Sequence, residues 1–366
     1  MLNALKFDEM NHRFDQVSEA HAKTFKWIFS DEKNEKDFST GFLFHVSAKL
    51  GAGKSTLMKL IINNPHVQDR LQQWAGKSCL PSPTICFLTH VKKSFDGMCR
   101  ALLYGAIDGR PELTRLLFPS HWKAAWSAPW QASKELIIHH TEVREALKLL
   151  VDHSKANETF SFCFFIDGLD ELEESTDFQH RHLAETLKEW SRHSSANIKF
   201  CVSSREYSTF LHHFQQEQRI RLHDLTKRDM EKYVKDVTRG VRNYGTPEIN
   251  LDSIVKPLVD SIVDRAQGIF LWVKLVVNDL CNQMENGSRP EDLHLEVDKL
   301  PEGINHLFHH FMTSISHGAS QKAYQTLDMI LRANEWWIMI TLLITLLAWN
   351  FFEVREKAQP ALSSES

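Results

Sequence analysis

Residues 42–63 read FLFHVSAKLGAGKSTLMKLIIN, and this stretch decides the fold. Its apolar start, 42–48, predicts a short β-strand, and the run from Ser55 onward has helical composition without a breaker. Between them stand Gly51 and Gly53, which can take backbone conformations that other residues avoid. A strand, a glycine loop and a helix in this order gather backbone N–H groups at a helix N-terminus, where they bind phosphate. The stretch therefore predicts a phosphate-binding loop.

The side chains of this loop favour ATP with Mg²⁺. Lys54 would reach the terminal phosphates as a point charge, and Ser55 would offer its hydroxyl to the metal. Ala48 stands where the pattern usually begins with glycine. Alanine is the smallest residue with a Cβ, so it crowds the loop only slightly if its φ is negative.

A second pattern, SFCFFIDGLDEL at 161–172, places acids after an apolar run. The nearly continuous apolar run predicts a strand that is covered on both faces and ends at Asp167. A carboxylate at this edge of a parallel sheet lies beside the phosphate loop and can hold Mg²⁺. Asp170 and Glu171 follow, and either can orient or deprotonate an attacking water. We therefore expect Ser55 and Asp167 at the metal, with Asp170 and Glu171 as candidate catalytic residues.

Arg205 follows another predicted strand, 197–204, where it can report the γ-phosphate by pairing with it. The alternative is a surface arginine that pairs with Glu206 or another acid. The nearest match to a guanine-recognition motif, 226–229, also fits a capping box with Thr226 at the N-cap, so ATP is preferred over GTP. The residues expected to bind the nucleotide are Ala48, Gly51, Ala52, Gly53, Lys54, Ser55, Thr56 and Arg205.

The remaining pattern favours an α/β fold with a mostly parallel, five-stranded sheet, followed by an all-helical arm. The strands are expected at 42–48, 83–91, 160–167, 197–204 and 219–223. Helices are expected at 133–153, 181–193, 227–237, 253–265 and 269–284. The predicted domains are a helical lead-in (1–40), a P-loop NTPase domain (41–223), a helical domain (224–315) and a last region with a frayed tail (316–366), which the family resemblance given below implies to be truncated and winged-helix-like.

Composition limits the classes of function. Hydrophobic residues make up 42% and charged residues 25% of the 366, which is ordinary for a globular protein. The net charge of −4 gives no basic field, so nucleic acid is not expected as a partner. Six cysteines without close spacing fit a reducing compartment and an intracellular, cytoplasmic location. The twenty histidines show no spacing typical of a metal site.

The segment 336–352, WWIMITLLITLLAWNFF, is apolar and carries no charge. As a helix it would span about 26 Å, slightly less than the ~30 Å hydrocarbon core of a bilayer. Two interpretations stay open. The segment is either a membrane anchor or partner-buried helix, or a core helix of the winged-helix-like region.

In combination, these motifs resemble those of NACHT-type NTPases of the STAND class, and in particular fungal proteins with a nephrocystin-3-like N-terminal domain. HVSAKLGAGKSTLMKLI (45–61) is similar to their P-loop, or Walker A motif, and FFIDGLDEL (164–172) to their Walker B motif with its extra acidic pair. KFCVSSREY (199–207) is similar to their sensor strand, with Glu206 in place of a common proline. The flanking segments 7–29, 220–234 and 262–280 also resemble the family.

The resemblance implies an ATP-dependent switch in signal transduction, whose nucleotide state decides whether the module is closed or assembled with protein partners or with itself. Hydrolysis is expected to be slow and to serve as a reset. The alternative is a non-hydrolysing interaction scaffold that keeps the fold. Ala48 and the absence of recognisable effector and repeat domains motivate that alternative.

Overall fold

The computed structural model describes residues 1–7, 12–22, 24–29, 43–76, 84–87, 94–127, 136–156, 160–174, 178–193, 197–240, 251–288, 290–314, 325–326 and 328. The chain divides into two compact units, each described here by itself. The first unit comprises Met1–Thr238 and Gly268–Leu271, and the second Arg239–Gln267 and Trp272–Ser366. The first unit thus continues past the boundary predicted at residue 223.

The first unit is built on a parallel sheet with the strand order β2-β3-β4-β1-β5. The strands are β1 (Leu43–Ser47), β2 (Thr84–Phe87), β3 (Phe162–Asp167), β4 (Ile198–Ser204) and β5 (Arg219–Arg221). Each strand lies inside one of the predicted ranges, and every pair of neighbouring strands is parallel. The prediction of an α/β fold with a parallel sheet is confirmed.

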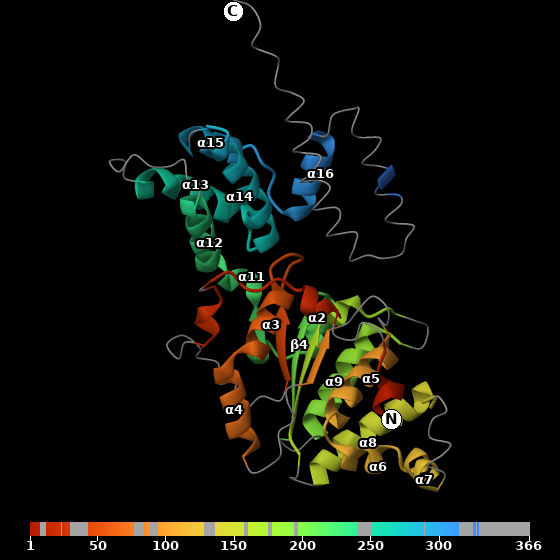
Figure 1. Ribbon diagram of the computed structural model, residues 1–366. Helices are drawn as coiled ribbons and strands as arrows, with labels where there is room; N and C mark the ends of the chain where they lie inside the picture. Colours follow the sequence, from red (N-terminus) through yellow and green to blue (C-terminus); the bar gives the residue numbers. More distant parts are fainter. Residues whose placement is uncertain are drawn as a thin grey trace, which may run out of the picture. The chain divides into compact units, whose positions relative to one another are not determined.

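Helices cover both faces of this sheet. Figure 1 shows α3 and α4 on one side, and α5, α8 and α9 on the other. The α-helices of this unit are α1 (Leu2–Leu5), α2 (His12–Gln16), α3 (Lys54–Asn63), α4 (Pro65–Ala75), α5 (Phe95–Ile107), α6 (Pro111–Leu117), α7 (Pro119–Ser127), α8 (His140–Ala156), α9 (His180–His193), α10 (Ser208–His213), α11 (Leu222–Leu225) and most of α12 (Lys227–Gly240). Short 3₁₀ turns are η1 (Lys26–Phe29), η4 (Leu169–Glu171) and η5 (Gln216–Gln218).

Strand β3 separates two apolar cores by the alternation of its side chains. Phe164 and Ile166 pack into the cluster formed with α5, α8 and α9. Cys163 and Phe165 point the other way, into the cluster that contains Leu57 of α3. Successive side chains of a strand point to opposite faces, so a continuous apolar run fills both cores. Burial of each such large side chain contributes about 1.5–3 kcal/mol to stability.

Two predicted helices differ from the structure. The described part of the lead-in is three short helices, α1, α2 and η1, and Phe25 between them has a left-handed φ of 59°. Helices this short are unstable alone, so contacts with the rest of the unit hold them. Helix α8 begins at His140 and not before it, because Glu142 Oε2 accepts the His139 backbone N–H (2.9 Å) and caps the helix there.

The second unit consists of helices in its described part. They are α13 (Leu251–Ala266), α14 (Phe270–Glu285, whose first two residues belong to the first unit), α15 (Pro290–Val297) and α16 (Ile304–Ser314). Trp272 is fully buried, and its indole Nε1 donates to the Pro301 carbonyl (3.2 Å). Arg265 Nη1 donates to the Leu300 carbonyl (2.8 Å). These contacts tie α13 and α14 to the turn before α16.

Among the residues that the structure describes, no helix combines the length and the apolarity needed to cross a membrane. The apolar segment 336–352 and most of the region predicted at 316–366 lie outside the described residues.

His45 is a fully buried histidine in β1, which lies between β4 and β5 in the sheet. Its Nε2 lies 2.7 Å from Ser204 Oγ, and its ring packs edge-on against the Phe214 ring with centroids 4.9 Å apart. Burial lowers the pKa of His45 to about 3. The imidazole therefore stays neutral in the folded protein, whereas in the unfolded chain it takes up a proton below about pH 6.5.

This difference predicts a loss of stability on acidification. Between pH 7.5 and 5.5 the unfolded chain gains a proton at His45 that the folded chain does not, so the free energy of unfolding should fall by about 1.4 kcal/mol from this residue. The His45→Gln variant should lack this part of the fall. Urea denaturation followed by circular dichroism at both pH values measures it. The same substitution at exposed His66 is the control, and equal pH dependence of wild type and His45→Gln would contradict the prediction.

Candidate functional site

The glycine loop connects β1 to α3 and has the conformation that its glycines predict. Gly51 has a φ of 74°, and Gly53, the N-cap residue of α3, a φ of 96°. Both values are in the left-handed region that favours glycine. Ala48 is fully buried, its N–H donates to the Ser204 carbonyl (3.2 Å), and it is not among the residues with positive φ. The missing first glycine therefore does not strain this loop.

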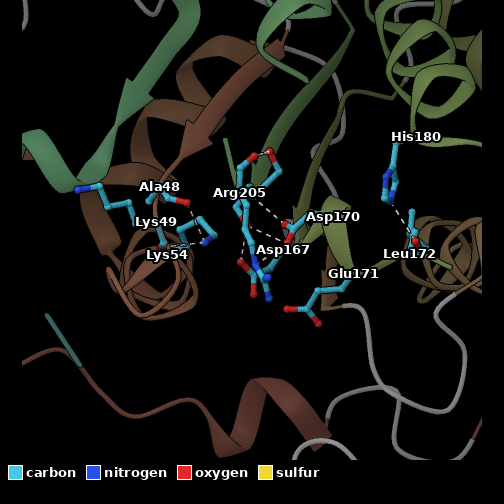
Figure 2. A network of polar contacts seen from close by, with 12 residues as sticks. Ala48, Lys49, Lys54, Asp167, Asp170, Glu171, Leu172, His180 and Arg205 are labelled. Carbon is cyan, nitrogen blue, oxygen red and sulfur yellow. Dashed lines mark hydrogen bonds and ion pairs between the residues drawn. The ribbon is translucent and has the colours of Figure 1, made fainter. Parts of the chain in front are cut away.

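Lys54 begins α3 and turns its ammonium group back toward the loop (Figure 2). Its Nζ lies 3.4 Å from the Ala48 carbonyl oxygen and 3.5 Å from that of Lys49. At these lengths the hydrogen bonds are weak. Burial lowers the pKa of Lys54, although the carboxylates of Asp170 and Asp167 act in the opposite direction. The ammonium thus lies at the loop without a strong partner among its hydrogen bonds.

Asp167, at the end of β3, is 1% exposed and is bound by two hydroxyl groups. Ser55 Oγ donates to its Oδ2 (2.6 Å), and Ser203 Oγ donates to its Oδ1 (2.5 Å). These short distances are typical of hydrogen bonds to a charged carboxylate. Ser203 Oγ also accepts the Gly168 backbone N–H (3.0 Å). The two residues predicted at the metal, Ser55 and Asp167, are therefore in direct contact.

Asp170 and Arg205 form a pair that fixes the turn after β4 (Figure 2). The Arg205 backbone N–H donates to Asp170 Oδ1 (2.9 Å), and the Arg205 Nε lies 3.1 Å from Asp170 Oδ2. The Asp170 side chain is 3% exposed and that of Arg205 is 40% exposed. Of the two alternatives for Arg205, the structure has the pairing with an acid, and this acid is Asp170 and not Glu206. Glu206 instead binds Arg221 (2.7 Å).

Glu171 has a partner that sequence analysis missed. Arg13 in α2 donates from Nη1 to Glu171 Oε2 (2.7 Å) and from Nη2 to Oε1 (2.8 Å). Its Nη2 also lies 3.5 Å from Asp167 Oδ2. Burial acts to lower the pKa of Arg13, but the neighbouring Asp167 and Glu171 carboxylates raise it overall. No local pattern could predict this pair, because the two residues are 158 positions apart.

Arg13 belongs to an N-terminal segment, residues 12–22 and 24–29, that docks on the rest of the first unit. Lys59 Nζ of α3 donates to the Val17 carbonyl (2.8 Å). The Phe25 backbone N–H (3.1 Å) and the Trp27 Nε1 (2.9 Å) both donate to Asp229 Oδ2 of α12. The segment is thus fixed to the helix after the glycine loop and to α12.

The capping box predicted at 226–229 does not form. Asp229 binds the N-terminal segment instead of the start of its own helix, and in the described part of the chain the buried Thr226 hydroxyl has no hydrogen-bond partner. Burial raises the pKa of Asp229, against the effect of these two hydrogen bonds. The indole and amide donors of the N-terminal segment replace the donors expected at the helix end.

A second segment, Gly268–Leu271, contacts the glycine loop within the first unit. The Leu271 backbone N–H donates to the Gly51 carbonyl (2.9 Å). A Cβ at Gly51 would lie 2.9 Å from Leu271 Cβ, and a Cβ at Gly268 would lie 2.3 Å from the His223 carbonyl oxygen. Both glycines are therefore needed for close approach as well as for their positive φ.

The structure brings most of the predicted site together around the start of α3. Ala52 is buried in the core beside α3, and Thr56 is half-buried in the first turn of that helix. Ser55 contacts Asp167, and the carboxylates of Asp167 and Asp170 both act on the charge of Lys54. Arg13 is the site residue that the sequence analysis did not predict. The arrangement places the backbone N–H groups at the start of α3 and the Lys54 ammonium, which suit an anion, beside carboxylate and hydroxyl oxygens, which suit a metal ion.

A known protein family matches the part of the chain that contains most of this site. The family described as nephrocystin 3, N-terminal, matches residues 23–205. The match contains the glycine loop, the acids of 167–171 and Arg205, and it begins after Arg13. No curated protein matches the chain.

The contact between Gly51 and Leu271 predicts a local sensitivity to a single methyl group. Gly51→Ala should lower the free energy of unfolding by about 1–3 kcal/mol more than Gly76→Ala. Gly76 also has positive φ (62°), but a Cβ there has nothing within 4 Å, so it controls for backbone strain alone. Urea denaturation of the three proteins measures the difference. Equal destabilisation would show that Leu271 does not restrict the loop.

Proposed function

Because the chain belongs to the nephrocystin 3 N-terminal family, we propose that it binds Mg·ATP at the glycine loop and acts as a nucleotide-dependent switch in signal transduction. In this proposal the loop is a P-loop, or Walker A motif, and β3 with its acids is the Walker B strand. The hydrogen bond between Ser55 and Asp167 carries the proposal. It joins the hydroxyl that follows the loop to the carboxylate at the end of β3.

The residues present fit both parts of the ligand. Backbone N–H groups at the start of α3, with the helix dipole, suit an anion, and Gly51 and Gly53 keep side chains away from the loop. Lys54 adds a half-buried positive charge at the same place. Ser55 and Asp167 offer the hard oxygen atoms that Mg²⁺ prefers. Magnesium, when bound, neutralises charge on the phosphate oxygens.

The contacts of the two other acids assign them different roles in this proposal. Asp170 is 3% exposed and already holds both the backbone and the side chain of Arg205, so it positions that arginine toward the γ-phosphate. Glu171 is 21% exposed, and Arg13 binds its carboxylate end. We assign to Glu171 the orientation of the attacking water.

The wider role follows from the family type. Nucleotide state would decide whether the protein is closed or assembled with protein partners or with further copies of itself. The net charge of −4 argues against nucleic acid as a partner. Among the described residues, Cys99, Cys163, Cys201 and Cys281 form no disulfide, which fits an intracellular, reducing location. Slow hydrolysis would return the switch to its starting state.

The Lys54→Ala variant tests nucleotide binding directly. Loss of a charged contact to phosphate should raise the Kd of a fluorescent ATP analogue about 10- to 100-fold in the presence of Mg²⁺. Lys123→Ala, on the exposed face of α7, is the matched control for loss of one lysine and should leave the Kd unchanged. Fluorescence titration gives both values. Equal Kd values for wild type and Lys54→Ala would overturn the proposed site.

Single-turnover hydrolysis separates a switch from a scaffold that binds nucleotide without hydrolysing it. Glu171→Gln should keep ATP bound and slow its hydrolysis by about 100-fold or more, since general-base catalysis contributes at least that much. The same slow background in wild type, Lys54→Ala and Glu171→Gln would favour the scaffold. A loss in Asp170→Asn but not in Glu171→Gln would exchange the roles assigned to the two acids.

A further inference from the structure

Arg13 contacts both Asp167, which the proposed function places at the metal, and Glu171, which it places at the attacking water. Its guanidinium binds both oxygens of Glu171, and its Nη2 lies 3.5 Å from Asp167 Oδ2. The same Asp167 oxygen accepts the Ser55 hydroxyl (2.6 Å). Any cation held by Ser55 and Asp167 would therefore use an oxygen that Arg13 already neutralises.

Burial makes this neutralisation necessary. Arg13 is 5% exposed and Asp167 1% exposed, and a buried charge without an opposite charge is costly. A Cβ at Gly168 would lie 3.4 Å from Arg13 Nη1, so the glycine after the strand leaves room for the guanidinium. The fold thus accommodates the positive charge of Arg13 beside the acids.

We propose that Arg13 is an internal counter-ion that competes with Mg²⁺ for the carboxylate of Asp167. The inference rests on the proposed function, because it assigns a role to Arg13 toward the metal of that site. Two cations next to the same carboxylate oxygen repel each other strongly in a poorly solvated place. Binding of the metal therefore weakens the hold of Glu171 and Asp167 on Arg13.

Competition of this kind is reciprocal. If Mg²⁺ weakens the contacts of Arg13, then Arg13 weakens the binding of Mg²⁺ by the same factor. Arg13 is part of the N-terminal segment, and its carbonyl accepts the Val17 backbone N–H (3.1 Å). Metal binding at the acids is thereby coupled to the docking of this segment.

The first test measures how strongly nucleotide binding depends on Mg²⁺. The Kd of a fluorescent ATP analogue is determined in excess EDTA and in excess Mg²⁺. The ratio of the Kd in EDTA to the Kd in Mg²⁺ is then compared between variants. In Arg13→Gln the ratio should rise at least about 5-fold over wild type, because the metal loses its competitor. Arg13→Lys keeps the charge without the paired contacts to Glu171 and should lie between the two.

Lys59→Gln is the matched control. It removes contacts of the same N-terminal segment, to the Val17 carbonyl and to Glu19 (3.0 Å), and leaves the acids untouched. Its ratio should equal that of wild type. If Arg13→Gln behaves like Lys59→Gln, or if its ratio falls, the competition is refuted while nucleotide binding stands. If wild type binds no nucleotide in either condition, the proposed function fails, and this inference with it.

A second test uses only the wild-type protein and does not depend on the folding of a variant. Hydrogen exchange of residues 12–29 is compared between ATP in EDTA and ATP with Mg²⁺. The amide of Val17 should exchange faster when the metal is present, because the contacts of Arg13 are then weakened. Equal or slower exchange with Mg²⁺ would overturn the proposal.

Discussion

The carboxylate of Asp167 binds one hydroxyl with each of its oxygens, and the two hydroxyls come from α3 and β4. A charge this deeply buried is stable only with such partners. Ser55 fixes the beginning of α3 and with it the end of the glycine loop. Ser203 also accepts the N–H of Gly168 and so fixes the start of the acidic turn. The loop, the strand and the turn therefore depend on a single carboxylate for their relative positions.

The parts of the fold that local sequence patterns encode could be predicted. A continuous apolar run such as 162–166, ended by Asp167, is typical of a strand covered on both faces, so its end and its type can be predicted from one short window. Gly51 and Gly53 likewise indicate their own backbone conformation. The acids after β3 were found for the same reason, since parallel strands bring their carboxyl ends to one edge.

Contacts between distant segments could not be predicted in this way. Arg13 and Glu171 are far apart in the sequence, and nothing around Arg13 distinguishes it from a solvated arginine on a short helix. Asp229 fits a capping box locally, but the amide of Phe25 and the indole of Trp27 bind its carboxylate. Arg205 was expected to meet the γ-phosphate or to pair with Glu206 or another acid, and its pairing with Asp170 depends on the geometry of two strand ends. In each case a tertiary partner outcompetes the local one.

The position of Arg13 has a consequence for anyone who isolates this domain. The family match begins at residue 23, so a recombinant fragment cut at that boundary keeps Phe25, Trp27 and every residue of the glycine loop but loses the guanidinium. Such a fragment would contain Asp167 and Glu171 without Arg13, so cations from the buffer would have to neutralise the two carboxylates. The dependence of such a fragment on cations would then result from the loss of Arg13. The dependence of the protein itself has to be measured on a chain that contains Arg13.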